Sequence, residues 1–231
     1  MIDAQAKQIL DKIVGQIFGY QNPFTLEQFQ SKFGFDVKLP QQVYDSTTNE
    51  PTWASSTNPS KFMSFKNTLD APEDFWLKEK RPINSIQDII AYWNETNVMA
   101  TERYLDSINV IQSDNIRRSE NIYRSQDIEE CKNVLYSESI ARAEFLAASQ
   151  RSVNSTFCIR LEDSGECSNS FNVQWSTKIT NSLFIQDCAN MQDCMFTSHM
   201  NSKQYFIANM PFEKDEYMKI RDMVIRWILT G

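Results

Sequence analysis

The sequence predicts an α+β protein with a helical and extended N-terminal half, a β-solenoid of 12-residue repeats and a C-terminal capping helix. Three observations support this prediction. Apolar residues recur at helical spacing near both ends of the chain, residues 39–61 are polar and contain three prolines, and residues 109–209 repeat at a step of twelve. The predicted segments are 1–38 (N-terminal helices), 39–62 (extended interaction arm), 63–106 (helical segment), 107–210 (β-solenoid) and 211–231 (C-terminal capping helix).

The N-terminal half begins with two helices. Residues 3–18 carry their apolar side chains on one helical face, and Gly19 ends the pattern. A shorter helix follows in FTLEQFQSKF, where Thr25 stands at the N-cap and Gln28 in the capping-box position. We interpret the first helix as surplus to the core and therefore as a surface for partners, with these residues as the interaction candidates: Ile9, Ile13 and Ile17.

Residues 39–62 are predicted to form an extended interaction arm. The stretch is rich in Ser, Thr and Asn and shows little periodicity, so it is not expected to fold as core. Fixing each backbone residue costs about 1 to 2 kcal/mol, more than its few apolar groups offset against their own domain. We therefore expect neighbouring subunits to hold the arm, with Trp53 and Phe62 as its anchors.

Two further helices complete the helical part. In PINSIQDIIAYWNETN, Ser85 is the N-cap of a helix with this apolar face: Ile86, Ile89, Ile90 and Trp93. Residues 213–229 form another, with acids in the first turn and Gly231 after its end. Because this second helix directly follows the repeats, it is placed to cover one end of a solenoid.

The repeat is visible in columns of like residues twelve positions apart. One column is apolar at nine consecutive positions: Ile111, Tyr123, Leu135, Ala147, Ile159, Phe171, Leu183, Met195 and Ile207. Asn109, Asn121 and Asn133 begin a second column, and serines and cysteines occupy others. Several columns in register favour a β-solenoid over an antiparallel meander, with the apolar column in the interior. Since twelve residues are short for a coil, we expect two repeat units per coil.

Candidate chemical groups are few. Cys188, Cys194 and His199 are a possible zinc set, but no Cys-x-x-Cys occurs, and the cysteines follow the phase of the repeat. Asp163 and Glu166 flank Gly165, as carboxylates do on some β-helix enzymes, although a solvated acidic turn is the commoner explanation. The sequence therefore predicts no catalytic residues, no metal and no cofactor.

The composition limits which partners and which cellular compartment are expected. The 231 residues are 41% hydrophobic and carry a formal net charge of −7. No apolar run approaches the roughly 18 residues that cross a bilayer, and the first residues do not resemble a secretory signal. Basic residues cluster only at 78–81 and 117–118, which is too few for binding along a phosphate backbone. We expect neither a membrane nor a sequence-specific nucleic acid partner, and five free thiols in a reducing compartment.

Residues 193–220 resemble the end of a family of repeat-built solenoid proteins from uncultured bacteria and phages. The residues that match its pattern are Cys194, Lys203, Tyr205, Ile207, Asn209, Glu216 and Tyr217. The Asn- and Ser-rich, acidic chain with its long N-terminal arm is also similar to a virion component of a crAss-like bacteriophage. That resemblance implies a ring or neck subunit at the portal vertex, bound to copies of itself and to portal or tail proteins. It would lie in the virion, and in the host cytoplasm during assembly.

Three classes of function remain open from the sequence. The first, which we favour, is a non-enzymatic structural protein of a virion ring. The second is a β-helix protein that binds or processes glycans, for which the candidate aromatic residues are Tyr123, Tyr136 and Trp175. The third is a cytosolic metal-binding solenoid.

Overall fold

The 12-residue repeat is one complete coil of a β-solenoid. In the computed structural model, which describes residues 3–230, each strand pairs in parallel with the strand one repeat away. Val134, for example, is paired with Ile122 on one side and Leu146 on the other. About nine coils stack between residues 104 and 207, so the predicted solenoid is confirmed. The expectation of two repeat units per coil was wrong: the coil closes after twelve residues.

The strands of the solenoid are short because each coil turns a corner every few residues. They are β5 (Tyr104–Leu105), β6 (Ile108–Ile111), β7 (Asp114–Arg117), β8 (Glu120–Tyr123), β9 (Gln126–Glu129), β10 (Lys132–Leu135), β11 (Glu138–Ala141), β12 (Glu144–Ala147), β13 (Gln150–Val153), β14 (Thr156–Glu162), β15 (Ser168–Gln174), β16 (Thr177–Thr180), β17 (Leu183–Gln186), β18 (Ala189–Gln192), β19 (Met195–Ser198), β20 (Phe206–Ile207) and β21 (Met210–Pro211). The antiparallel pair β20–β21 ends the stack.

Left-handed backbone makes these corners. From Asp106 to Ala208 every third residue has a positive φ, which gives four such corners in each coil. Asparagine tolerates this conformation better than most residues, which explains the asparagine column. The column also bonds along the stack, because the Asn109 amide donates to Asn121 at 3.0 Å and the Asn121 amide donates to Asn133 at 2.9 Å.

The serine and cysteine columns hold successive turns together. The Ser113 hydroxyl donates to the carbonyl of Ile111 at 2.7 Å and accepts the N–H of Ser125 at 3.1 Å. Cys131 takes an equivalent place: its N–H donates to the Ser119 hydroxyl, and its thiol donates to the Glu129 carbonyl. Serine and cysteine can both fill this place, because each has a small side chain that donates back to the backbone, whereas Ala143 fills it without that bond.

The solenoid has two apolar cores rather than one. Between the strands lies a cluster of buried side chains that includes Ile116, Val134 and Leu146. The nine-residue apolar column belongs to the other cluster, which lies between the outside of the coils and the helices. Leu135 and Leu183 are fully buried there, but against helices and not inside the coils. The predicted interior position of this column was therefore wrong, because a second buried face exists that repeat periodicity alone does not distinguish.

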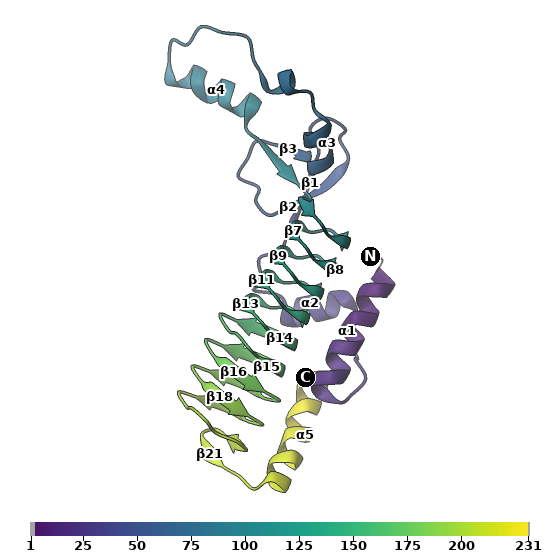
Figure 1. Cartoon of the computed structure of the whole chain (residues 1–231), viewed down its shortest axis with the longest axis vertical. Coiled ribbons are helices and arrows are strands. Elements are labelled where there is room, and N and C mark those ends of the chain that lie inside the picture. Colours follow the sequence, from purple (N-terminus) through teal and green to yellow (C-terminus); the bar gives the residue numbers. More distant parts are fainter. Residues whose placement is uncertain (1–2, 231) are drawn as a thin grey trace.

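Three helices cover that outer face (Figure 1). They are α1 (Asp3–Phe18), α2 (Leu26–Phe33) and α5 (Lys214–Thr230). The predicted capping box of α2 is present, with Thr25 and Gln28 bonded reciprocally. Ile13 and Ile17 are 0% and 2% exposed, and Ile9 packs against the same cluster. The expectation that Ile9, Ile13 and Ile17 face partners was therefore wrong, since the chain's own solenoid buries Ile13 and Ile17 and partly covers Ile9.

The C-terminal helix α5 begins at the last coil and runs back along the stack (Figure 1). Tyr217 in its first turns contacts Tyr205, with ring centroids 5.5 Å apart, and Trp227 near its end lies 6.0 Å from Phe184. The helix thus covers the flank of several coils. It was predicted to cover the end of the solenoid, but it covers only a small part of that end. No helix among residues 3–230 is long and apolar enough to span a bilayer.

Residues 39–62 fold onto their own chain. β1 (Gln41–Tyr44) and β2 (Pro51–Ala54) form a hairpin, and β3 (Lys61–Ser64) pairs in parallel with β4 (Val98–Thr101). The buried Asp45 accepts the backbone N–H groups of Thr47 and Ser64. Trp53 and Phe62 are half-buried in this small sheet. The interaction arm was therefore wrongly predicted: hydrogen bonds within the chain order the segment without neighbouring subunits.

Residues 65–97 form a unit that projects past the first coil (Figure 1). It contains α3 (Phe65–Asp70), a 3-10 helix at Glu73–Trp76 and α4 (Ile86–Thr96). Where this part of the chain meets the solenoid, Asp114 pairs with Arg103 at 2.8 Å and accepts the N–H of Ser55 at 3.0 Å. The predicted helix at residue 86 and its Ser85 cap are confirmed.

Candidate functional site

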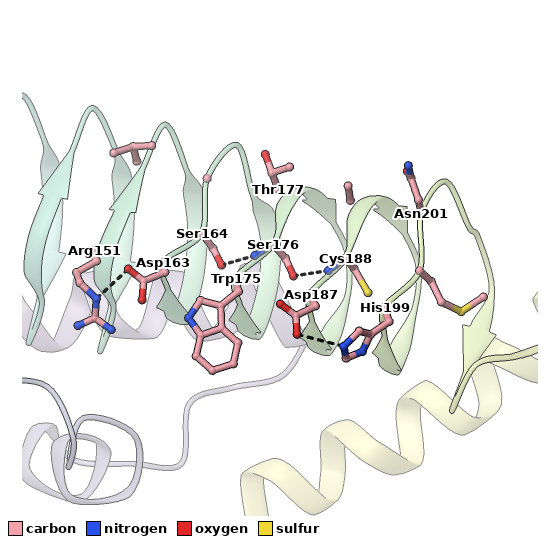
Figure 2. Close-up of a pocket in the computed structure, with 14 residues that line it drawn as sticks. Arg151, Asp163, Ser164, Trp175, Ser176, Thr177, Asp187, Cys188, His199 and Asn201 are labelled. Carbon is pink, nitrogen blue, oxygen red and sulfur yellow. Dashed lines mark hydrogen bonds and ion pairs between the residues drawn. The ribbon is translucent and has the colours of Figure 1, made fainter.

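A groove on the bare side of the solenoid is the first candidate site. Figure 2 shows five side chains in one line along it, each twelve residues from the next and each at a left-handed corner. They are Arg151, Asp163, Trp175, Asp187 and His199. Since successive coils are about 4.8 Å apart, the line is about 19 Å long. The repeat therefore gathers residues from 49 positions of sequence into one surface row.

Polar side chains at each end of the row lie close to a partner. Arg151 donates to Asp163 at 2.8 Å and to Glu162 at 2.7 Å. The bond from Arg151 holds the pKa of Asp163 below its usual value, and the side chain of Trp175 adds to this effect. At the other end, His199 lies 3.6 Å from Asp187.

The groove is wide and open, with a volume of about 820 Å³. Its floor is the column Ser164, Ser176 and Cys188, in which each N–H donates to the hydroxyl before it, at 3.2 and 3.0 Å. On the far wall Gly165 has no side chain, and a Cβ there would lie 3.3 Å from the Val153 methyl group. A side chain at Gly165 would therefore press against Val153.

Some of the residues noted from the sequence line the groove, and others do not. Of the two carboxylates beside Gly165, for which a solvated acidic turn was the favoured explanation, Asp163 lines the groove and Glu166 does not. Of the aromatic candidates for a glycan site, Tyr123 and Tyr136 are buried, whereas Trp175 is 52% exposed. Sequence reasoning missed Arg151 and Asp187, although writing out the column in phase with Trp175 and His199 would have found both.

The possible zinc set is not brought together. Cys188 and Cys194 are buried, and their thiols donate to backbone carbonyls, whereas the side chain of His199 is 73% exposed. Burial raises the pKa of both thiols, which disfavours the thiolate that binds metal. Within residues 3–230 no three His, Cys, Asp or Glu side chains gather as metal ligands would.

The second candidate site is the exposed apolar face of α4. The exposed fractions of Ile86, Ile89, Ile90 and Trp93 lie between 47% and 64%. Beside them is a groove of about 390 Å³ between the helix and residues 78–83, whose rim carries Lys78 and Lys80. The sequence predicted this apolar face but not its exposure.

The third candidate site is an aromatic pocket of about 330 Å³ where α2 and α5 meet the coils. Phe35 and Trp227, 71% and 59% exposed, stand at its rim, and Phe171 and Phe184 line it. Arg160 lies over the Phe35 ring and pairs with Asp36 at 2.7 Å, so its charge is already neutralised. No sequence signal indicated this pocket, because its residues come from three distant segments.

Comparisons with protein-family models, with curated proteins and with solved structures find no match to this chain. The candidate sites are therefore judged on their geometry.

Proposed function

We propose that this chain is a non-enzymatic structural protein that assembles with further copies of itself into a ring. The observation that carries the proposal is the apolar face of α4. This helix has a complete capping box at Ser85 and Asp88, so it is a well-formed element. Its apolar residues nevertheless face solvent, and contiguous exposed apolar surface of this kind marks protein–protein contacts.

The occupant we assign to this face is a second copy of the chain. The aromatic pocket around Phe35 and Trp227 is lined by residues of α2, α5 and the coils. Figure 1 shows that α2 and α5 lie along the flank of the coils, well away from α4. A contact of α4 with α4 would leave the pocket uncovered, whereas α4 of one copy in the pocket of the next covers both. Such head-to-tail contacts repeat from copy to copy, and they form a ring when the rotation between neighbouring copies closes. Trp93, 58% exposed, is the natural anchor, because buried aromatic side chains dominate interface energies.

The resemblance to a virion component extends this proposal. A ring of this kind would belong to the portal vertex or tail neck of a crAss-like bacteriophage, where portal or tail proteins would bind it. The chain would then be found in the virion, after assembly in the host cytoplasm. We expect peptides of this chain to be present in purified particles of a phage that encodes it. Their absence would exclude the virion role.

Light scattering after size exclusion tests the assembly. The wild-type chain should give the mass of several copies at micromolar concentrations. A double variant, Ile90→Ser with Trp93→Ser, should be monomeric, and so should Phe35→Ser. The control Ile108→Ser removes a side chain that is 60% exposed on the first coil, and it should assemble normally.

Mixing the two monomeric variants makes the test specific to a head-to-tail contact. Each keeps the surface that the other has lost, so the mixture should form one-to-one dimers. A wild-type chain that stays monomeric at every concentration would overturn self-assembly. Variants that assemble as the wild type does would show that these two surfaces are not its contacts.

A further inference from the structure

Trp175 stands at the centre of the row, and its side chain is a hydrogen-bond partner of Asp163. Its ring is 52% exposed, and its backbone is left-handed, with φ of 46°. The same column holds the smaller polar residues Asn115, Asp127 and Ser139 in earlier coils. A tryptophan here exposes a large apolar surface and gains little packing in return. Such a residue is better explained by a ligand.

The indole ring of Trp175 is already oriented before a ligand binds. In Figure 2 the indole is seen flat on, between Asp163 and Asp187, with its nitrogen turned toward Asp163. Asp163 is itself fixed by Arg151 at 2.8 Å. A flat aromatic side chain that is already oriented loses little conformational entropy when it binds, which favours affinity.

The groove around the ring presents acceptors for hydroxyl groups. The carboxylates of Asp163 and Asp187 come from the coils before and after Trp175, about 10 Å apart along the stack. The opposite wall is formed by Gly165, Thr177 and Ala189 (Figure 2). The face of an aromatic ring is negative and attracts C–H groups, while carboxylates accept hydrogen bonds from hydroxyls. A sugar ring offers both kinds of group at this spacing.

We infer that this groove binds a neutral glycan chain, stacked on Trp175 and held through its hydroxyls by Asp163 and Asp187. Neutral sugars fit better than acidic ones, because these two carboxylates flank the ring and the only arginine of the row is already paired with Asp163 and Glu162. The row is longer than one sugar ring, so a polymer would be engaged at several positions.

Asp163 is suited to binding a glycan and not to acting as the acid that cleaves one. Glycoside hydrolysis needs one carboxyl group that stays protonated to act as the general acid. The pKa of Asp163 is lowered by Arg151, which keeps it ionised. Glycan binding is therefore an activity separate from ring assembly, and it uses a different face of the molecule.

Affinity electrophoresis of the full chain tests this inference. Native gels would contain one of four neutral polysaccharides (dextran, mannan, galactomannan or hydroxyethyl cellulose) or the acidic polymer polygalacturonate. At least one neutral polymer should retard the wild-type protein, and polygalacturonate should not. Trp175→Ala should weaken the apparent affinity at least tenfold, and Asp187→Ala should weaken it less. The control Trp76→Ala removes a tryptophan that is 41% exposed far from the groove, and it should bind as the wild type does.

Three results would overturn the inference. They are no retardation by any of the four neutral polymers, equal retardation of Trp175→Ala and wild type, and retardation by polygalacturonate alone. Because the variants lie on the solenoid surface, far-UV circular dichroism should match the wild type. None of these results bears on ring assembly, which is measured by mass with the variants of α4 and Phe35.

Discussion

The helices α1 and α4 have the same kind of sequence and opposite surroundings. Both place their apolar residues on one helical face. In α1 that face is buried against the outer surface of the coils, with Leu10 and Ile13 fully inaccessible. In α4 the corresponding residues are about half exposed, because no other element of the described chain covers them. The comparison teaches that an amphipathic pattern predicts a buried face, but not whether the same chain or a partner buries it.

The largest expected effect comes from placing a charge on the buried helix. Ile13→Asp puts an unpaired carboxylate where the wild-type side chain is 0% exposed. Burying such a charge costs several kcal/mol, so the free energy of unfolding should fall by about 4 kcal/mol or more. Urea denaturation followed by circular dichroism measures this loss. A midpoint close to that of the wild type would mean that α1 can leave the solenoid without cost, and the contrast with α4 would disappear.

A smaller effect is expected from acid, at the part of the chain that joins the projecting unit to the coils. Burial alone would raise the pKa of Asp45, but hydrogen bonds from Ser64, Thr47 and Asn67 outweigh it and lower the pKa strongly. In Asp114, likewise, the Arg103 ion pair outweighs burial and lowers the pKa. A carboxyl group with a lowered pKa stabilises the fold above its unfolded value of about 4, and this stabilisation is lost as the pH falls below that value.

The partly buried Glu102 acts in the opposite direction, because loss of solvent around its carboxyl group raises its pKa, but the shift of Asp45 is the larger one. The projecting unit should therefore loosen first as the pH falls from 4 to 2. Tryptophan emission, to which Trp53, Trp76 and Trp93 contribute, should change before the strand signal in circular dichroism does. A single transition shared by both signals would show that the unit and the solenoid unfold together.

The smallest expected effect on stability is the matched substitution in α4. Ile90→Asp changes a side chain that is 51% exposed, so the free energy of unfolding should stay within about 0.5 kcal/mol of the wild type. Its effect should appear only in the mass of the assembly, which should fall to that of the monomer. If Ile90→Asp instead destabilises the isolated chain as strongly as Ile13→Asp does, the exposed face of α4 is part of the chain's own fold.

Local sequence determined much of this protein. The step of twelve, the helix at residues 3–18, and the caps at Thr25 and Ser85 were all predictable, because they depend on hydrogen bonds and periodicities within a few residues or one repeat. Of the groove, Asp163, Trp175 and His199 were singled out from the sequence, but as separate residues. The spacing of the repeat implies that they share a row, and only the left-handed corners decide that this row faces solvent.

Tertiary structure decided which surfaces are covered. The column of Leu135 and Leu183 is equally apolar whether it fills the coil or supports a helix, and only the packing of α1, α2 and α5 selects the second. Residues 39–62 carry too little apolar area to predict their order, yet parallel pairing with β4 and the bonds to Asp45 supply it. The exposed face of α4 and the pocket of Phe35 and Trp227 depend in the same way on contacts between distant segments, which no local pattern encodes.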